Sequence, residues 1–413
     1  MGMTITEKIL ARKSGQAKVS PGDLVTVGVD TVVFVDTMFV PTRWRKIKKL
    51  DHPERVVVVL DHRAPVPDRQ GAATHKIARE FVDQYGIERF HDIGYDQGIS
   101  HQVVADHAYA LPGSLLVCSD SHTGSAGVFN CLARGVGVPD VFYAATLGET
   151  WFIVGETIRY DLSGRLPRAV TMKDAFLQIA GRYGDHTNTN VEYGGSALAH
   201  LSISARKTLT TMSTELSAEF AVCEADPVMI DWLRQRTDKP FECVSPDHDA
   251  RYADVRTVDL SVLEPLVALP DGVVRNSQPV AKVAGTHIDQ AFVGSCANGT
   301  VEDLALVAQV LRGQQRAAPV ADDRGVERRL EALVLEQQVP VGDLSELDVE
   351  ELGGHLVEGG VTLLKRPGQV RGGVEHELVV VLGRGQHFRE RVLRVQQRGL
   401  DGALGEVIAL DQL

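Results

Sequence analysis

Two short polar segments of the chain combine acidic and imidazole side chains that could move protons. Asp61 and His62 directly follow one short apolar run, and Asp120 and His122 follow another. Side chains of these types serve as general acids and bases in enzymes. One such pair is explained about as well by a capped turn, but two pairs in equivalent positions favour a catalytic site.

The elements that must position these pairs are readable from the apolar pattern. The runs 56–60 and 114–117 are short and continuous, which is typical of strands buried on both faces. Between them, 72–85 has helical periodicity. The apolar face of this helix is expected to contain Ala72, Ile77, Ala78, Phe81 and Val82. Ligands in α/β folds bind beyond the carboxyl ends of strands, so a cleft is expected there.

A further histidine, His101, lies between the two strands in a Gly-Ile-Ser-His-Gln segment, on a predicted loop or helix start. Taken singly, it is more often a loop histidine than a catalytic one. Its position between the two Asp–His segments makes it a candidate for the same site.

Length and composition limit the class of protein. The chain has 413 residues, of which 44% are hydrophobic and 24% charged, which predicts two or three α/β domains in a globular protein. A net charge of −12 argues against nonspecific nucleic-acid binding. The basic run 43–49 is expected to be a solvated helix face. No apolar run reaches membrane-spanning length and the start does not resemble a secretory signal, so we expect a cytoplasmic protein and no membrane partner.

The five cysteines favour neither a disulfide framework nor a local metal motif. They lack a Cys-x-x-Cys pair, and their positions are 118, 131, 223, 243 and 296. For the first four, the preferred interpretation is a small apolar side chain in the core.

Six segments in order resemble blocks of the aconitase family, nearest to the large subunits of its 3-isopropylmalate dehydratase and homoaconitase branch. The match covers about residues 20–312. The segments are VVVVLDHRAPVPD, GISHQV, CSDSHTGSAGVFNCLARGVG, VEYG at 191–194, LTTMSTELSAEF and IDQAFVGSCANGTVEDL.

The resemblance implies an iron-sulfur hydro-lyase that removes water from a small hydroxy-di- or tricarboxylate. The substrate would be 3-isopropylmalate in leucine synthesis, homoaconitate or a dimethylmalate. A [4Fe-4S] cluster would bind the substrate hydroxyl. Carried over residue by residue, the implied catalytic groups are Asp61, His62, His101, Asp120, His122 and Glu215. The implied substrate-binding residues are Ser121, Thr123 and Asn298, and the implied first cluster ligand is Cys296.

The resemblance also implies a partner. Single-chain aconitases carry a mobile swivel domain, and in the split branch that domain is a separate small subunit. We therefore expect a heteromeric complex with a small subunit. The alternative from another class is a catalytically inactive, cluster-less protein of the same fold with a binding or regulatory role.

The last hundred residues depart from the family. Its two further cluster cysteines are missing, and after about Arg312 the chain contains no Cys, Asn, Met, Tyr or Trp. Two explanations remain open: a genuinely different C-terminal extension, or a reading-frame change in the gene.

The expected fold is an aconitase-like three-domain α/β/α arrangement with the active-site cleft at the domain junction. The predicted domains are 1–165, 166–285 and 286–413, the last incomplete or aberrant after about 312. Thr171 is expected to cap the first helix of the second domain. A strand is expected from His287 to Cys296. The six catalytic candidates should converge, with Cys296 on the floor of the cleft and no other cysteine near them.

Overall fold

The structure, a computed structural model, describes residues 2–94, 96–270, 275–288 and 291–312, and the backbone of several strands beyond them. It divides into two compact units, Met1–Gly285 and Thr286–Leu413. The three-domain division stays a prediction.

The helices of the first unit are α1 (Ile5–Ser14), α2 (Arg69–Tyr85), α3 (Ser100–Asp106), α4 (Val138–Leu147), α5 (Met172–Tyr183), α6 (Ile203–Met212) and α7 (Pro227–Arg234). Within the described part, none of the helices combines the length and apolarity that a membrane span requires.

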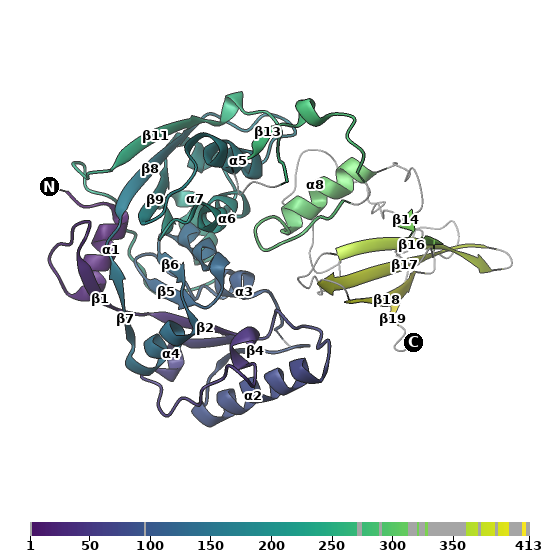
Figure 1. The fold of residues 1–413 in the computed structure, drawn as a ribbon, viewed down its shortest axis with the longest axis horizontal. Coiled ribbons are helices and arrows are strands. Elements are labelled where there is room, and N and C mark those ends of the chain that lie inside the picture. The colour runs from purple at the N-terminus through teal and green to yellow at the C-terminus, as the bar shows by residue number, and fades with distance from the viewer. Residues whose placement is uncertain are drawn as a thin grey trace. The chain divides into compact units, whose positions relative to one another are not determined.

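A five-stranded parallel sheet holds the first set of polar strand ends (Figure 1). Its strands are β2 (Thr31–Val35), β3 (Val56–Val59), β4 (Arg89–His91), β5 (Leu115–Cys118) and β6 (Leu132–Gly135). Their order is β4-β3-β2-β5-β6, so the chain builds outward from β2 on one side and then returns to its other side. The point between β2 and β5 is where the strand order reverses, which is the usual ligand crevice of such sheets.

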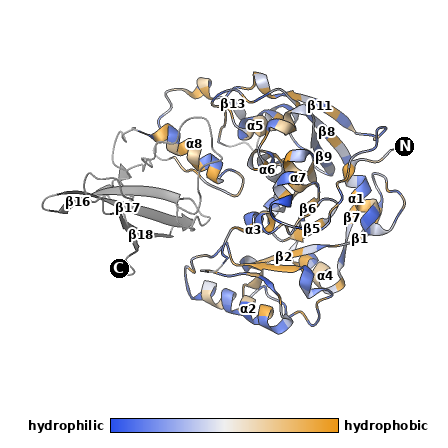
Figure 2. Cartoon of the chain, turned by 180° about the vertical axis from the view of Figure 1, so that it is seen from behind, coloured by the Kyte–Doolittle hydropathy of each residue, from blue (hydrophilic) through white to orange (hydrophobic). Residues whose placement is uncertain are grey.

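The predicted strands at 56–60 and 114–117 are confirmed. Every residue of β2, β3 and β5 is buried, as expected where both faces of a parallel sheet are covered. In Figure 2, β2 is orange whereas α2 alternates between blue and orange, which matches a buried strand and a helix with one buried face.

The helix predicted at 72–85 begins three residues earlier, at Arg69, and ends at Tyr85 as expected. It begins earlier because the Asp68 carboxylate accepts a hydrogen bond from the Gly71 backbone N–H at 2.7 Å and caps the first turn. Gly86 ends the helix in the left-handed conformation, at φ 60°.

The apolar face of α2 was predicted only in part. Ala78, Phe81 and Val82 are buried, but Ala72 is exposed and Ile77 is only half-buried. The buried stripe instead includes Gly71, Thr74 and His75, which lie in line with Ala78 at helical spacing. The prediction was wrong because it assumed that only apolar residues face inward.

A second parallel sheet, ordered β10-β9-β8-β11, follows in the chain. Its strands are β8 (Glu156–Ser163), β9 (Thr189–Gly194), β10 (Ala221–Cys223) and β11 (Asp254–Asp259). Thr171 and Asp174 form a capping box at the start of α5, as predicted for Thr171. Two antiparallel ribbons complete the unit: β1 (Leu24–Gly28) with β7 (Glu149–Ile153), and β12 (Leu266–Ala268) with β13 (Ser277–Pro279).

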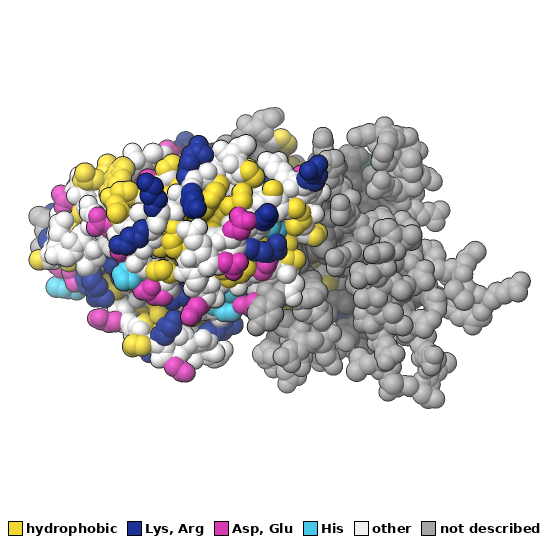
Figure 3. Space-filling view, turned by 90° about the horizontal axis from the view of Figure 1, so that it is seen from below, with side chains coloured by type: hydrophobic (Ala, Val, Ile, Leu, Met, Phe, Trp, Pro, Cys, Tyr) yellow, Lys and Arg dark blue, Asp and Glu magenta, His cyan; other side chains and the backbone are white. Residues whose placement is uncertain are grey.

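The basic run 43–49 is exposed as predicted, but it forms no helix. Trp44 is half-buried and Ile47 is buried, so apolar side chains hold an irregular segment while its cationic side chains face solvent. On the face shown in Figure 3, Lys and Arg side chains are interspersed with Asp and Glu rather than gathered by sign.

The second unit contains α8 (Val301–Leu311), which begins with a Thr300–Asp303 capping box. The strand expected to lead to Cys296 is not formed, because residues 291–296 make irregular backbone without a paired neighbour in the described part. Further strands are β14 (Val320–Ala321), β15 (Glu327–Arg328), β16 (Val361–Val370), β17 (Gly373–Arg384), β18 (His387–Val395) and β19 (Val407–Ala409). The last four form one antiparallel sheet.

Candidate active site

Three carboxylates follow the central strands of the first sheet. Asp36 comes directly after β2, Asp61 comes two residues after β3, and Asp120 comes two residues after β5. Because these strands are parallel neighbours, their carboxyl ends meet at one edge. Asp36 and Asp61 are almost fully buried, so their charges require partners.

Two histidines supply those partners and join the carboxylates into one chain. His62 donates from Nδ1 to Asp61 Oδ1 at 2.6 Å and from Nε2 to Asp120 Oδ2 at 2.9 Å. His101 donates from Nε2 to Asp120 Oδ1, also at 2.9 Å. The order Asp61–His62–Asp120–His101 is therefore an unbroken path of charge-assisted hydrogen bonds.

Backbone donors fix the two buried carboxylates. Asp36 accepts from the N–H groups of His62 at 3.2 Å and Arg63 at 2.6 Å. Asp61 accepts from the N–H of Ser100 at 2.9 Å. Ser100 is the first residue of α3, and the first N–H groups of a helix have no acceptor within the helix. The Ser100 N–H instead donates to Asp61. This bond sets the start of the helix that carries His101.

The network changes the proton affinity of its members. Burial alone would lower the pKa of His62, but hydrogen bonds to Asp120 and Asp61 outweigh it and raise that pKa to about 10. Burial would raise the pKa of Asp61 and of Asp120, yet bonds from His62, and for Asp120 also from His101, hold both pKa values below their ordinary values. At neutral pH, His62 is therefore an imidazolium between two carboxylates.

A second, more open pair adjoins this chain. His122 donates from Nε2 to Glu215 Oε1 at 3.1 Å, and its backbone N–H donates to Asp120 Oδ1 at 2.8 Å. The side chains of His122 and Glu215 are 25% and 41% exposed. They lie on two 3-10 turns, Ser121–Phe129 and Ser213–Leu216, which contact each other. The structure thus brings together all six residues that the resemblance singled out as catalytic.

The other predicted residues are placed differently. Ser121 is exposed beside this pair, whereas Thr123 is buried and its hydroxyl donates to the Asp120 carbonyl at 2.6 Å. Thr123 therefore stabilises the turn that presents Asp120. Cys296 and Asn298 belong to the second unit, and their place at the site stays a prediction.

Sequence reasoning missed three buried polar residues of the site. His75, on α2, donates from Nε2 to Asp36 at 3.4 Å. Lys207, on α6, donates to the Gln102 side chain at 3.0 Å next to His101. Asp36 could have been found, because it follows an apolar run as the two predicted pairs do. Nothing local in the sequence singles out His75 or Lys207.

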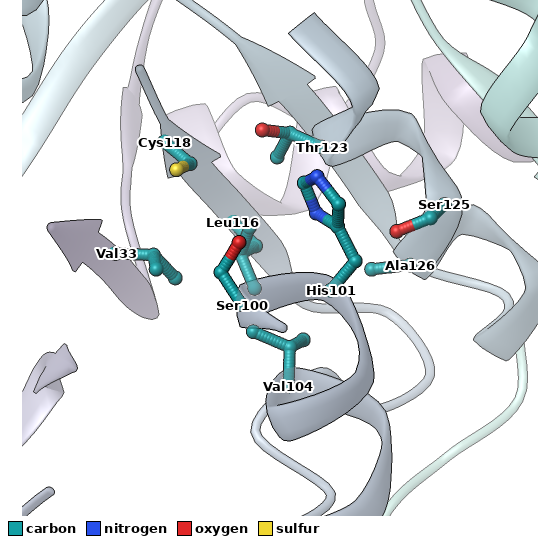
Figure 4. A pocket seen from close by; sticks show the side chains of 9 residues that line it. All are labelled: Val33, Ser100, His101, Val104, Leu116, Cys118, Thr123, Ser125 and Ala126. Atoms are coloured by element: carbon teal, nitrogen blue, oxygen red, sulfur yellow. The ribbon is translucent and has the colours of Figure 1, made fainter. Parts of the chain in front are cut away.

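A small cavity of about 10 Å³ lies beside His101 (Figure 4). It has room for about one water molecule. Cys118 lines it together with Ser100 and Thr123, which corrects the expectation that no cysteine other than Cys296 would lie near the site. Cys118 ends β5 only two residues before Asp120, so the strand end that positions the carboxylate also places the thiol.

The cysteines do not fit a [4Fe-4S] cluster, which in this type of site needs three thiolates. Cys118, Cys131 and Cys223 are buried in the core, and burial raises the pKa of each to about 12, so all three stay protonated. Cys131 also donates its thiol to the Ala126 carbonyl at 3.0 Å. Only Cys243 and Cys296 then remain, one fewer than the cluster requires. Cys243 is half-buried, so its predicted place in the core is only partly right.

A parallel sheet that carries acid–base side chains where its strand order reverses is typical of an α/β enzyme. Comparison with known proteins identifies the family. The model of the aconitase family (aconitate hydratase) matches residues 36–275. The chain belongs to the aconitase family, so the predicted family and its α/β fold class are confirmed.

Relatives of similar length indicate which branch of the aconitase family this chain resembles. A "3-isopropylmalate dehydratase large subunit" of Mycolicibacterium smegmatis is 46% identical over 319 residues, covering 77% of this chain and 75% of that one. A "Probable 3-isopropylmalate dehydratase large subunit" of Methanothermobacter thermautotrophicus is 36% identical, covering 76% of each chain. A "Probable methanogen homoaconitase large subunit" of the same organism is also 36% identical, covering 75% and 74%.

Proposed function

We propose that this chain is the large subunit of a hydro-lyase that dehydrates and rehydrates a small hydroxy-di- or tricarboxylate, with 3-isopropylmalate as the first candidate and homoaconitate as the second. The observation that carries the proposal is the Asp61–His62–Asp120–His101 chain beside the His122–Glu215 pair. The names of its relatives support the substrate class.

The buried chain supplies the proton that departing hydroxide needs. His62 is protonated at neutral pH, since hydrogen bonds to Asp120 and Asp61 raise its pKa to about 10. Asp120 links this imidazolium to His101 Nε2, so when the His101 ring gives a proton to hydroxide from Nδ1, a proton can enter the ring at Nε2 through Asp120. The carboxylates keep the donors oriented, and the dry surroundings strengthen the interaction with the developing charge.

The exposed pair is suited to substrate contact. His122 and Glu215 face solvent more than the other four residues, and the His122 backbone is fixed on Asp120. A hydroxy acid entering here meets an imidazole that can hold its hydroxyl and a carboxylate that can accept its proton. Because the matched relatives are called large subunits, the complete enzyme would include a small subunit.

A dehydration assay that follows the enoate product tests this proposal. The chain co-expressed with the small subunit should turn over 3-isopropylmalate, and Asp120→Asn should abolish turnover while the complex still forms. Full activity from this polypeptide alone would overturn the need for a partner, and wild-type activity in Asp120→Asn would overturn the role of the network.

A second candidate, an inactive family member that binds substrate or partner without turnover, is favoured by the cysteine placement described above. Anaerobic purification with ample iron separates the two. Brown protein with iron-sulfur absorbance and turnover supports the enzyme, whereas colourless protein that binds the hydroxy acid without turnover supports the second candidate.

A further inference from the structure

A separate cluster of two histidines and one aspartate lies at the outer strand of the same sheet. His91 Nδ1 lies 2.9 Å from Asp96 Oδ2, and His107 Nε2 lies 3.3 Å from the same oxygen. All three ligand atoms lie within 4.8 Å of one another. None of these residues belongs to the catalytic set.

These distances suit a shared metal ion. Two atoms that each bind an ion at about 2.1 Å are about 3.0 Å apart at a right angle and about 3.4 Å apart at the tetrahedral angle. The two separations from Asp96 match this span. Two imidazoles and one carboxylate also match the ligand preference of zinc and neighbouring divalent transition metals, and three protein ligands leave a position for water.

A supporting hydrogen bond fixes the buried ligand. His91 is almost fully buried, and its other ring nitrogen, Nε2, lies 3.1 Å from the Tyr109 hydroxyl. Without an ion, Nδ1 donates to the Asp96 oxygens. When an ion is bound, Nε2 would carry the proton and donate to Tyr109, which leaves the Nδ1 lone pair for the ion. Such second contacts orient metal-binding histidines and set their tautomer. The ring of His107 is stacked on Tyr109 at 16° between planes, which holds the third ligand in place.

The chain reaches this arrangement through three separate local features. His91 is the last residue of β4, Asp96 follows with a left-handed φ of 51°, and His107 caps the end of α3. The left-handed region is uncommon for residues other than glycine, although Asp enters it more readily than most. Here it turns both the carboxylate and the carbonyl of Asp96 towards His91 Nδ1, the carbonyl at 3.2 Å.

We propose that His91, Asp96 and His107 form a binding site for a divalent transition-metal ion, with Zn²⁺ as the best-matched ion. The ion ties the segment 96–107 to the end of β4. Because the same segment carries Ser100 and His101 into the catalytic network, metal at one end of α3 stabilises the position of the catalytic histidine at its other end.

Among the described residues, a second group with ligand atoms within 4.8 Å, formed by Asp36, Asp61 and His62, provides the contrast. In this group both ring nitrogens of His62 already donate to carboxylates, and the Asp36 carboxylate oxygens already accept from backbone N–H groups. A cation would have to displace these donors, so this group is not expected to compete.

The test uses the full chain after chelator treatment, with Co²⁺ alone as the probe and Zn²⁺ as the competitor. Wild-type protein should bind one equivalent of Co²⁺ with visible d–d absorbance, and Zn²⁺ should displace it. His107→Ala, at a half-exposed surface position, should lose this equivalent. Tyr109→Phe should keep it with affinity weakened about 10- to 100-fold.

Two control variants keep the result interpretable. His248→Ala removes a histidine that is 95% exposed, and His62→Gln disrupts the other candidate group; both should retain the equivalent. Hydrogen exchange should also show slower exchange over 96–107 when Zn²⁺ is added to wild type but not to His107→Ala. The proposal would be overturned if wild-type protein bound no Co²⁺, or if folded His107→Ala still bound one equivalent of Co²⁺. The three residues would then be a hydrogen-bonded cluster without metal.

Discussion

The two His–Asp groups at the carboxyl edge of the first sheet differ in burial and in the number of donors around each carboxylate. At the central strands, Asp120 accepts from His62, His101 and a backbone N–H, and its side chain is only 15% exposed. At the outer strand, Asp96 is 44% exposed and contacts two imidazoles. The group at the central strands is therefore a buried network in which donors already occupy the carboxylate oxygens and protons are held. The group at the outer strand is more open and is the one proposed to bind a cation.

Removing the central carboxylate should break this contrast most strongly. Asp120→Asn leaves the buried His62 with one carboxylate fewer and should destabilise the first unit by about 3 to 5 kcal/mol, as for other broken buried pairs. Urea unfolding measures the loss. Asp83→Asn, an exposed position on α2, is the matched control and should change stability by less than about 0.5 kcal/mol. Equal effects of the two substitutions would show that the network is not a buried ion pair.

The His62 network predicts a loss of stability at alkaline pH. The folded-state pKa, raised to about 10 chiefly by bonds to Asp120 and Asp61, exceeds the ordinary value of 6.5. The stabilisation is therefore complete below 6.5 and is lost as pH rises through about 10, with a slope of up to about 1.4 kcal/mol per pH unit. Unfolding curves across this range should show the slope in wild type. His62→Gln should flatten it, and an unchanged slope would contradict the assignment.

Glu192, which belongs to neither His–Asp group, should make the stability of the fold depend on pH. It is fully buried, and its carboxylate accepts from Thr6 N–H at 3.0 Å and from the Tyr252 hydroxyl at 3.1 Å. Burial raises its pKa to about 7, so the folded state holds a proton more tightly than the unfolded state. Stability should then fall as pH rises from about 4.5 to about 7, and Glu192→Gln should remove this component in thermal unfolding. An unchanged fall of stability over this pH range in the variant would rule out Glu192 as its source.

The smallest stability effect is expected at the exposed pair. His122→Ala removes a contact to a Glu215 side chain that is 41% exposed, so it should change stability by no more than about 1 kcal/mol. Turnover should nevertheless fall sharply, because His122 is proposed to contact substrate. Stability and kcat/KM measured on the same preparation test this separation. A large loss of stability with normal turnover would place His122 among the structural residues.

The sequence predicted which candidate side chains lie together wherever this follows from the strands that they end. Asp61, His62 and Asp120 follow apolar strands, and parallel pairing brings such ends together. Asp36 follows β2 in the same way and was within reach of this reasoning. The roles of His75 and Lys207 could not be predicted in this way, because they depend on which helix face packs over which strand end. The same limit explains Cys118, which lines one cavity with His101 although the sequence spacing of the two residues does not indicate it.

The protonation state of His62 decides whether the buried chain can supply a proton to the departing hydroxide. Nitrogen NMR of selectively labelled histidine side chains follows both ring nitrogens of His62 as pH rises. Both should remain protonated at pH values well above neutrality, with a midpoint at about 10, and Asp120→Asn should move the midpoint towards the ordinary 6.5. A wild-type midpoint near 6.5 would show that the buried chain does not hold the proton proposed for the dehydration.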